Sequence, residues 1–229
     1  MAGLQHNGGS LRGALSASAP TTHHTAPHLW LLPLTADDPW TLSEAERAWS
    51  AVLPPPVQHR YRISRHLLRC RLAVCLEMPP EAVPLHSPPG EAPCLAAGYG
   101  AVSLSHSRDQ LLLAWSPWSI GVDLEWQQRI LAAELLARRF FPPQEWQQLQ
   151  CQSPGERAAL VLESWVRKEA AIKWQRSSLA TDLRHWHWCA ERQRLEHLLE
   201  GWQPPCVFER RNGWLCAVVG QAAEQAIWD

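Results

Sequence analysis

Lysine is almost absent from this chain of 229 residues. The two lysines, Lys168 and Lys173, fall in one short segment, Trp165-Val-Arg-Lys-Glu-Ala-Ala-Ile-Lys173, and all the other strongly basic residues are arginine. A lysine ammonium is a compact charge on a flexible stem, whereas an arginine guanidinium is a planar fork. Keeping lysine at these two positions, on either side of Glu169, therefore predicts phosphate and metal chemistry in this segment. The alternative is that both lysines lie on a solvated helix face.

Other absences narrow the class of protein. The seven cysteines include no Cys-x-x-Cys pair and no zinc-ligand spacing, which indicates reduced core thiols in a cytoplasmic protein. No apolar run reaches the roughly 18 residues that a membrane-spanning helix needs. The chain has 21 basic and 22 acidic residues, so we expect no general attraction to nucleic acid or to a membrane. A phosphate site must then come from a local cluster of cations.

The apolar pattern predicts strands and helices in an order that repeats once. A helix is expected to begin at Thr41, with Glu44 completing a capping box, and residues 84–100 are rich in Pro and Gly and should be loop. The other predicted helices are Arg60–Met78, Ile130–Phe141, Gln144–Gln150 and Glu156–Gln175. The predicted strands are His28–Leu34, Ala101–Ser105, Leu111–Trp115, Ile120–Trp126, Leu183–Trp188, Val207–Arg210 and Trp214–Val219.

This order predicts an α+β fold made of two similar α/β lobes. We place the N-terminal lobe at residues 29–118 and the C-terminal lobe at residues 119–229. Residues 1–28 are rich in Ser, Thr, Ala, His and Gly and are expected to form a disordered tail.

Two acidic side chains share one face of a predicted strand, Gly121-Val-Asp-Leu-Glu125. Side chains at alternate positions point the same way, so Asp123 and Glu125 project together, about 7 Å apart, while Val122 and Leu124 enter the core. Paired carboxylates repel unless a cation lies between them or one of them is protonated. Oxygen ligands favour Mg²⁺, with Mn²⁺ as a possible substitute. The alternative is a solvated acidic strand face.

Cations and hydroxyls are available for a bound phosphate. Glu169 and Lys173 share a helix face, where Glu169 could be a third oxygen ligand or a base and Lys173 a phosphate contact; the alternative is a surface ion pair worth about 0.3–0.5 kcal/mol. At the end of a predicted strand, Ser105 and His106 could point at an anion. At least two of three arginines could gather at one phosphate monoester: Arg60, Arg62 and Arg65.

The order and spacing of these motifs closely resemble the 4′-phosphopantetheinyl transferase superfamily over residues 29–219. The motifs are Ser105-His106, Gly121-Val-Asp-Leu-Glu125, Phe140-Phe-Pro-Pro-Gln-Glu145 and Trp165-Val-Arg-Lys-Glu-Ala-Ala-Ile-Lys173. Length and the two expected lobes resemble the surfactin-synthetase-activating (Sfp) type rather than the short trimeric type. The resemblance implies lobes related by a pseudo-twofold axis, an active site at their interface, and a cytoplasmic monomer.

The activity that the resemblance implies is transfer of the phosphopantetheine arm of coenzyme A to a serine of an apo-acyl or peptidyl carrier protein, with release of 3′,5′-ADP. The carrier could belong to fatty-acid, polyketide or nonribosomal-peptide biosynthesis. Asp123, Glu125 and Glu169 match the family's Mg²⁺ ligands. Glu169 also matches the candidate base for the carrier serine, and Lys173 matches the residue at the pyrophosphate and leaving group.

The resemblance also implies contacts with coenzyme A. Ser105 and His106 match pyrophosphate contacts, and Arg65 matches an arginine on the 3′-phosphate. Arg60 and Arg62 fall near further basic positions of relatives. Lys168 is about 100° around the helix from Glu169, so we expect it at the edge of the site or facing the coenzyme A phosphates from outside.

Two departures from the family pattern bear on activity. Gly90-Glu-Ala-Pro93 replaces the usual Gly-Lys-Pro, so Glu91 is expected to weaken coenzyme A binding, and Ser103 replaces an asparagine. One alternative is therefore a catalytically weak carrier-binding homologue. Another Mg²⁺-dependent phosphate enzyme is a further alternative, although the chain lacks the Gly-x-x-x-x-Gly-Lys-[Ser/Thr] loop of common nucleotide hydrolases.

Overall fold

The computed structural model describes residues 26–35 and 40–229. The fold is mixed α+β, as predicted. A four-stranded sheet has the order β11-β1-β5-β4 and a three-stranded sheet the order β6-β10-β9. The first consists of Ile227–Trp228, His28–Pro33, Gln110–Ser116 and Ala101–Ser107, and the second of Ile120–Trp126, Trp214–Gly220 and Cys206–Arg211. Two short hairpins pair β2 (Leu85–His86) with β3 (Cys94–Leu95) and β7 (Trp186–Cys189) with β8 (Arg194–His197).

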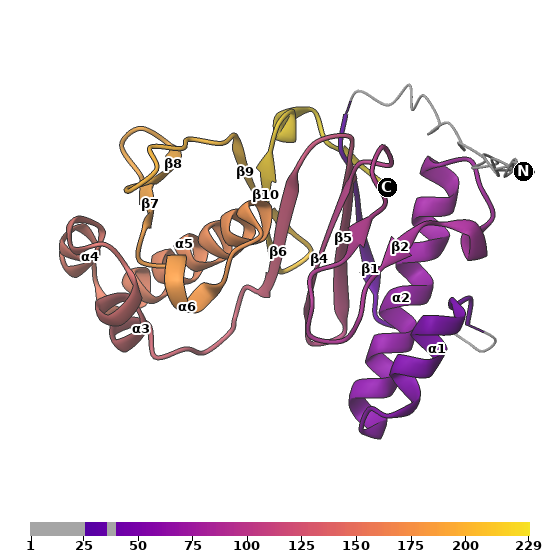
Figure 1. The fold of residues 1–229 in the computed structure, drawn as a ribbon. Helices are drawn as coiled ribbons and strands as arrows, with labels where there is room; N and C mark the ends of the chain where they lie inside the picture. Colours follow the sequence, from indigo (N-terminus) through magenta and orange to yellow (C-terminus); the bar gives the residue numbers. More distant parts are fainter. Residues whose placement is uncertain (1–25, 36–39) are drawn as a thin grey trace, which may run out of the picture.

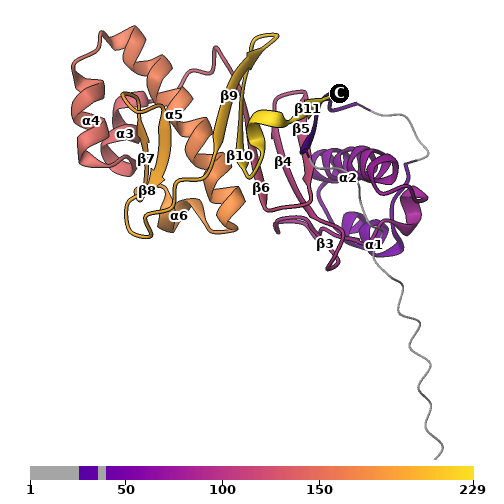
Figure 2. The same cartoon turned by 90° about the horizontal axis from the view of Figure 1, so that it is seen from above.

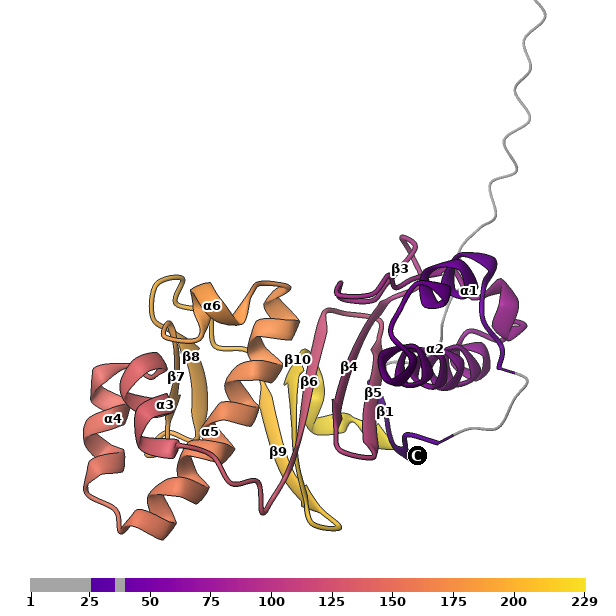
Figure 3. The same ribbon diagram turned by 90° about the horizontal axis from the view of Figure 1, so that it is seen from below.

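The two larger sheets lie next to each other between two long helices (Figure 1). Helix α2 (Pro55–Cys75) packs on the outer face of the first sheet, and α5 (Pro154–Gln175) packs on the outer face of the second. Helix α1 (Glu44–Ala51) lies beside α2, whereas α3 (Ala133–Phe140) and α4 (Pro143–Gln150) lie beyond α5 at the other end (Figures 2 and 3). None of the helices in the described ranges has the length and hydropathy needed to cross a membrane.

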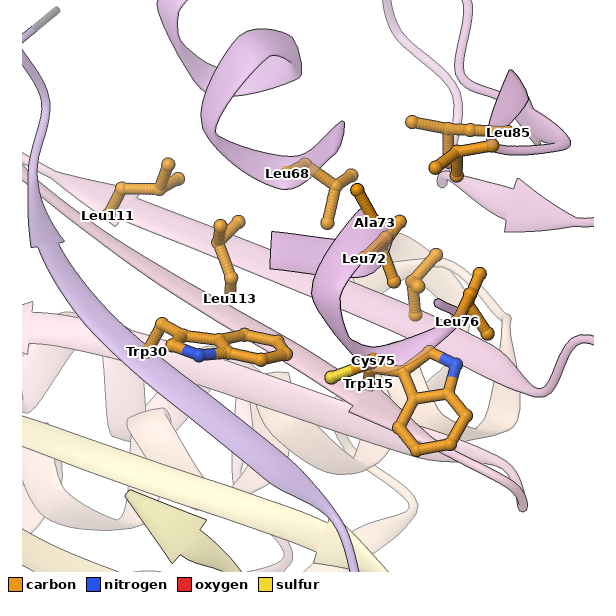
Figure 4. Packing of buried hydrophobic residues seen from close by; sticks show 12 residues of the cluster. Trp30, Leu68, Leu72, Ala73, Cys75, Leu76, Leu85, Leu111, Leu113 and Trp115 are labelled. Carbon is orange, nitrogen blue, oxygen red and sulfur yellow. The ribbon is translucent and has the colours of Figure 1, made fainter. Parts of the chain in front are cut away.

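Strand β5 is buried on both faces, and the alternation of its side chains connects two cores. Leu111, Leu113 and Trp115 pack with α2 residues such as Leu68 and Leu72 (Figure 4). The residues between them, Leu112 and Ala114, pack instead against Val122 and Leu124 of β6. A strand covered on both sides reads as a continuous apolar run, which is why Leu111–Trp115 was recognisable.

The main strands and helices occur where the sequence predicts them, except that the strand predicted over Leu183–Trp188 begins only at Trp186, because Leu183 caps α6. Strand β6 has the predicted bounds, and Val122 and Leu124 are buried as expected. Helix α2 begins at Pro55 instead of Arg60 because proline is tolerated in the first helical turn, where no intrahelical donor is needed. The predicted tail lies outside the described residues up to position 25, and His28 already belongs to β1.

The predicted helix start at Thr41 is wrong. The N-cap is Ser43, whose hydroxyl accepts the Glu46 N–H while the Glu46 carboxylate accepts the Ser43 N–H. Two Ser/Thr-x-x-Glu pairs overlap in the sequence, and the backbone N–H of Thr41 is instead bonded to His66 Nδ1 at 3.0 Å. A contact between distant segments therefore decides which capping pair is used.

Several short elements were missed. Strands β2 and β3 lie in the segment predicted to be loop, α6 (Leu179–Asp182) and β8 were not predicted, and β11 returns the C-terminal end to the first sheet, parallel to β1. Elements of two to four residues have too few positions to show a period. All seven cysteines are free thiols, but Cys151 is exposed and so does not belong to the core.

Helix α5 approaches β6 closely at Gly121. A Cβ built on Gly121 would lie 2.0 Å from the Ala170 carbonyl oxygen and 2.3 Å from the Trp174 backbone nitrogen. No side chain larger than hydrogen fits in that space. Asp123 is the next residue of β6 on the same face as Gly121. The close approach therefore sets the distance between Asp123 and the α5 residues Glu169 and Lys173.

We predict that Gly121→Ala lowers the free energy of unfolding by at least about 1–3 kcal/mol, since the added methyl group overpacks backbone against backbone. Urea denaturation measures the loss. The matched control is Gly155→Ala in the first turn of α5, where an added Cβ meets nothing within 4 Å; it should be neutral or stabilising. Equal unfolding midpoints for the two variants would contradict the close-approach argument.

Candidate active site

The predicted acidic residues lie where β4, β6 and α5 meet. Asp123 on β6 is 2% exposed. Its Oδ1 accepts two hydrogen bonds, from Ser105 Oγ at 2.7 Å and from Lys173 Nζ at 2.7 Å. Its Oδ2 is buried and has no hydrogen-bond partner among the described residues. Oδ1 therefore has two hydrogen-bond donors, whereas Oδ2 is a buried acceptor without one. An unpaired buried acceptor lowers stability unless a bound ligand interacts with it.

Glu125, two residues further along β6, is held in a similar way. Its Oε2 accepts a hydrogen bond from Ser107 Oγ at 2.9 Å, and its Oε1 accepts one from the Arg129 guanidinium. Burial raises the pKa of Glu125, while the Ser107 and Arg129 contacts oppose that rise. Both predicted carboxylates of the strand thus have a serine of β4 as a neighbour.

Glu169 is the third carboxylate, on α5 one turn before Lys173. Burial, and then the negative charge of Asp123, raise the pKa of Glu169 to about 8. A carboxyl group with a pKa near the working pH is suited to accept and return a proton. The predicted shared face of Glu169 and Lys173 is confirmed, since both interact with Asp123.

The three carboxylates fit a hard divalent cation such as Mg²⁺ by the chemistry of their donor atoms. Oxygen-only donors and an unpartnered buried oxygen on Asp123 are what such an ion needs. Among the described residues, the oxygens of Asp123, Glu125 and Glu169 do not all lie within 4.8 Å of one another. Lys173 and Arg129 each pair with one of these carboxylates, and like charges keep apart.

A second group of predicted residues lines a pocket on the α2 side of β4. Arg60, Arg65 and His106 border it together with Ser64 and Gly90. Burial, followed by the charge of Arg60, lowers the pKa of His106, so its ring is neutral and can donate one hydrogen bond to an anion. Arg60 and Arg65, two of the three arginines expected at one phosphate, thus line the same pocket. The third, Arg62, donates to Ser50 Oγ at 3.0 Å and packs over Trp40.

The chain is similar to known proteins. Residues 119–219 match the family model described as the 4′-phosphopantetheinyl transferase superfamily. Over this segment the chain is similar to that superfamily. The chain is also 29% identical over 158 residues to the 4′-phosphopantetheinyl transferase HetI of Nostoc sp. (strain PCC 7120), covering 64% of this chain and 67% of that protein.

The superfamily match contains β6 and α5 but not the residues that complete the site from the other side. Ser105 and His106 on β4, and Arg60 and Arg65 on α2, lie before residue 119. The prediction that Ser105 contacts phosphate remains a prediction, because its hydroxyl donates to Asp123 in this structure. Ser107 and Arg129 were not singled out from the sequence, because the predicted strand ends at Ser105 and no local pattern marks Arg129. The alternation of Ser103, Ser105 and Ser107 is the signal that could have found Ser107, since these side chains share one face of β4.

Lys168 does not lie at the edge of the site, which corrects the expectation from sequence. It is fully buried, with its Nζ 2.7 Å from Glu145 Oε2 and 3.5 Å from the centre of the Phe141 ring. Glu145 also accepts hydrogen bonds from the Ser164 hydroxyl and from the Trp188 backbone N–H. The segment Phe140-Phe-Pro-Pro-Gln-Glu145 therefore attaches α4 to α5 and β7.

A second group of ligand-type side chains does not qualify as a metal site. Asp182, His185 and His197 lie together, and Asp182 Oδ1 is 3.5 Å from His185 Nδ1. However, His197 Nδ1 accepts the Glu200 backbone N–H at 3.1 Å. A neutral imidazole that accepts at Nδ1 carries its proton on Nε2, so Nε2 has no lone pair for a metal. Only two ligands remain, and we assign no ion there.

We predict that Glu145→Gln costs about 3–5 kcal/mol at neutral pH because it leaves the buried Lys168 ammonium without a counter-charge. Burial lowers the pKa of Lys168 to about 8, whereas an unfolded lysine has a pKa of about 10.4. Between these values the unfolded chain binds more protons, so stability rises with pH. Glu145 raises the pKa of Lys168 in the wild-type protein, so in the variant this pKa lies below about 8. The variant should therefore regain stability as the pH rises from below about 8 to about 10, measured by urea unfolding.

The control for this prediction is the double variant Lys168→Met/Glu145→Gln, which has no buried charge to titrate. It should be more stable than Glu145→Gln at neutral pH and should show no such rise. Identical pH slopes in the two variants would mean that Lys168 is not the titrating group.

Proposed function

We propose that this protein is a 4′-phosphopantetheinyl transferase of the Sfp type, which moves the phosphopantetheine arm of coenzyme A to a serine of an apo-carrier protein and releases 3′,5′-ADP. The observation that carries the proposal is the environment of Asp123: Lys173 and Ser105 occupy one oxygen, and the other is buried and unpartnered beside Glu169. Phosphoryl transfer needs this arrangement of cation site, base and lysine, with little covalent help from the protein.

The architecture supports a two-lobed enzyme. We propose that residues 29–118 and 119–229 are the two lobes, related by a pseudo-twofold axis, with the active site at their interface. Each contains three antiparallel strands, β1-β5-β4 or β6-β10-β9, covered by one long helix, α2 with 21 residues and α5 with 22. Strand β11 of the second segment adds to β1 in parallel. We further propose that the enzyme acts as a cytoplasmic monomer.

Each residue of the site has a chemical task in the proposed reaction. The carrier serine Oγ bonds to the phosphorus that bears the pantetheine arm, and the bond from that phosphorus to the bridging oxygen of 3′,5′-ADP breaks. Glu169 accepts the serine proton, for which its raised pKa is matched. Lys173, with a side chain 31% exposed, can turn its ammonium towards the departing oxygen and donate a hydrogen bond or a proton.

Asp123, Glu125 and Glu169 are the proposed ligands of Mg²⁺. The bound ion would neutralise charge that develops on the pyrophosphate oxygens. Arg60, Arg65 and His106 are proposed to bind the phosphates of coenzyme A, because they line one pocket and a cationic pocket retains phosphate groups.

One observation favours a weaker enzyme as the second candidate. Glu91 is exposed and follows Gly90, which lines the cationic pocket, where the resemblance predicts a lysine instead. A negative charge there repels a nucleotide phosphate. A catalytically weak, carrier-binding homologue would result if this repulsion were strong enough to prevent binding of coenzyme A.

We predict that the purified protein, with Mg²⁺ and coenzyme A, adds about 340 Da to an apo-carrier protein, as the transfer of one phosphopantetheine group requires. Intact-protein mass spectrometry on a panel of acyl and peptidyl carriers measures the gain and identifies the carrier class. Binding of a carrier without any mass change, across the whole panel, would support the second candidate instead.

Lys173→Arg should lower kcat at least about tenfold, because a planar guanidinium cannot replace a compact ammonium that donates to Asp123 and the leaving oxygen. Steady-state kinetics with a competent carrier would measure this. The matched control is Arg184→Lys, the reverse exchange at an exposed position of the same lobe, which should leave kcat unchanged. Near-normal turnover of Lys173→Arg would remove the argument for a lysine at this position.

A further inference from the structure

We infer that Ser105 and Ser107 are positioning residues that hold Asp123 and Glu125 as metal ligands across the junction between the two sheets. The inference rests on the proposed function, since it takes these carboxylates to be the Mg²⁺ ligands. Ser105 would then orient a carboxylate instead of making the phosphate contact that the resemblance implies. Ser107, which was not a predicted site residue, would orient the second carboxylate.

The geometry at this junction is a regular series of hydroxyl contacts. Strand β4 pairs with β5, and β6 pairs with β10, so each is the edge strand of its own sheet. Alternate residues of β4 contact β6 at three successive levels. Ser103 Oγ accepts the Val122 N–H at 3.1 Å, Ser105 Oγ donates to Asp123 at 2.7 Å, and Ser107 Oγ donates to Glu125 at 2.9 Å.

These contacts make serine the link between the sheets. Ser103 and Ser105 are 5% and 6% exposed, so water competes little for their hydroxyls. A hydroxyl bonded to a carboxylate in a buried place forms a charge-assisted hydrogen bond, which is stronger than one between neutral groups. The first contact joins backbone to side chain, whereas the other two fix the direction of two acidic side chains.

Ser105 has been considered for a contact with Asp123 and for a contact with phosphate, and the single proton of its hydroxyl decides between them. A serine hydroxyl has one proton to donate, and Ser105 gives it to Asp123 Oδ1. It cannot also donate to a phosphate oxygen in the same state. His106, the next residue, lines the pocket on the opposite face of β4 with Arg60 and Arg65. The phosphate contact therefore falls to His106, and the carboxylate contact to Ser105.

The hydrogen bonds on Asp123 also decide which oxygen faces a cation. Ser105 and Lys173 both bind Oδ1 from different elements, which prevents rotation of the carboxylate and leaves Oδ2 directed away from them, buried and unpartnered. Without the Ser105 hydroxyl, Lys173 alone would hold the group, and the carboxylate could turn. Loss of an outer partner of this kind typically lowers metal affinity about 10–100-fold.

The test is titration of the purified full-length protein with Mn²⁺ and with Mg²⁺ by calorimetry. We expect Ser105→Ala to raise the metal Kd at least about 10-fold. Ser107→Ala should raise it less, because Glu125 keeps Arg129 as a partner. The matched control is Ser103→Ala, on the same face of β4 but bonded to a backbone N–H; it should keep the wild-type Kd even if it lowers the melting temperature.

Conservative replacements and kinetics make the test specific. Ser105→Thr keeps a hydroxyl and should recover most of the affinity, whereas Ser105→Cys, a weak donor of similar shape, should be intermediate. In the transfer assay, Ser105→Ala should raise the Mg²⁺ concentration needed for half-maximal rate and leave KM for coenzyme A unchanged. If Ser105→Ala does not fold, the Thr and Cys variants provide the same comparison.

The outcomes distinguish this inference from the proposed function. Wild-type protein that binds Mn²⁺ and modifies a carrier, while Ser105→Ala keeps the wild-type metal Kd, would overturn the inference alone. A raised KM for coenzyme A with an unchanged metal requirement would return Ser105 to the role of phosphate contact. Wild-type protein that neither binds the metal nor modifies any carrier would instead refute the proposed function.

Discussion

The buried carboxylate of Asp123 is the constraint on which the rest of the site depends. An ionised carboxylate 2% exposed to solvent is stable only when hydrogen bonds and cations compensate its lost hydration. Here the compensation comes from three parts of the chain: β6 carries the carboxylate, β4 supplies Ser105, and α5 supplies Lys173. The same requirement that stabilises the fold therefore brings the candidate catalytic groups together.

The close approach of α5 to β6 makes this compensation possible. Gly121 lets the helix backbone lie almost against the strand, two residues before Asp123 on the same face. A lysine side chain then reaches Asp123 with its ammonium at 2.7 Å while remaining 31% exposed at its outer side. That combination of a fixed inner contact and an accessible outer part is what a residue needs if it is to bind both a carboxylate and a substrate phosphate.

Much of the fold was predictable because its principal elements carry strong local patterns. Strand β6 and the doubly buried β5 could be read from apolar periodicity, and α5 from its length. The start of α1 could not, because two overlapping capping pairs compete locally and the contact between Thr41 and His66 lies outside either pair. Strand β11 was missed for a similar reason: two residues have no period, and only β1 makes them a strand.

The sequence by itself determined which residue types are available to the site and which of them share a face. The strand period pairs Asp123 with Glu125, and the helix period pairs Glu169 with Lys173. The sequence did not determine the fates of the two lysines. Lys173 lies five positions beyond Lys168, about 140° around the helix, and only the tertiary structure shows that Lys173 faces β6 while Lys168 is buried against Glu145. The partners of Ser105 and Ser107 were likewise decided by tertiary structure, since β4 and β6 are edge strands of different sheets. Local periodicity carries no information about which edges meet.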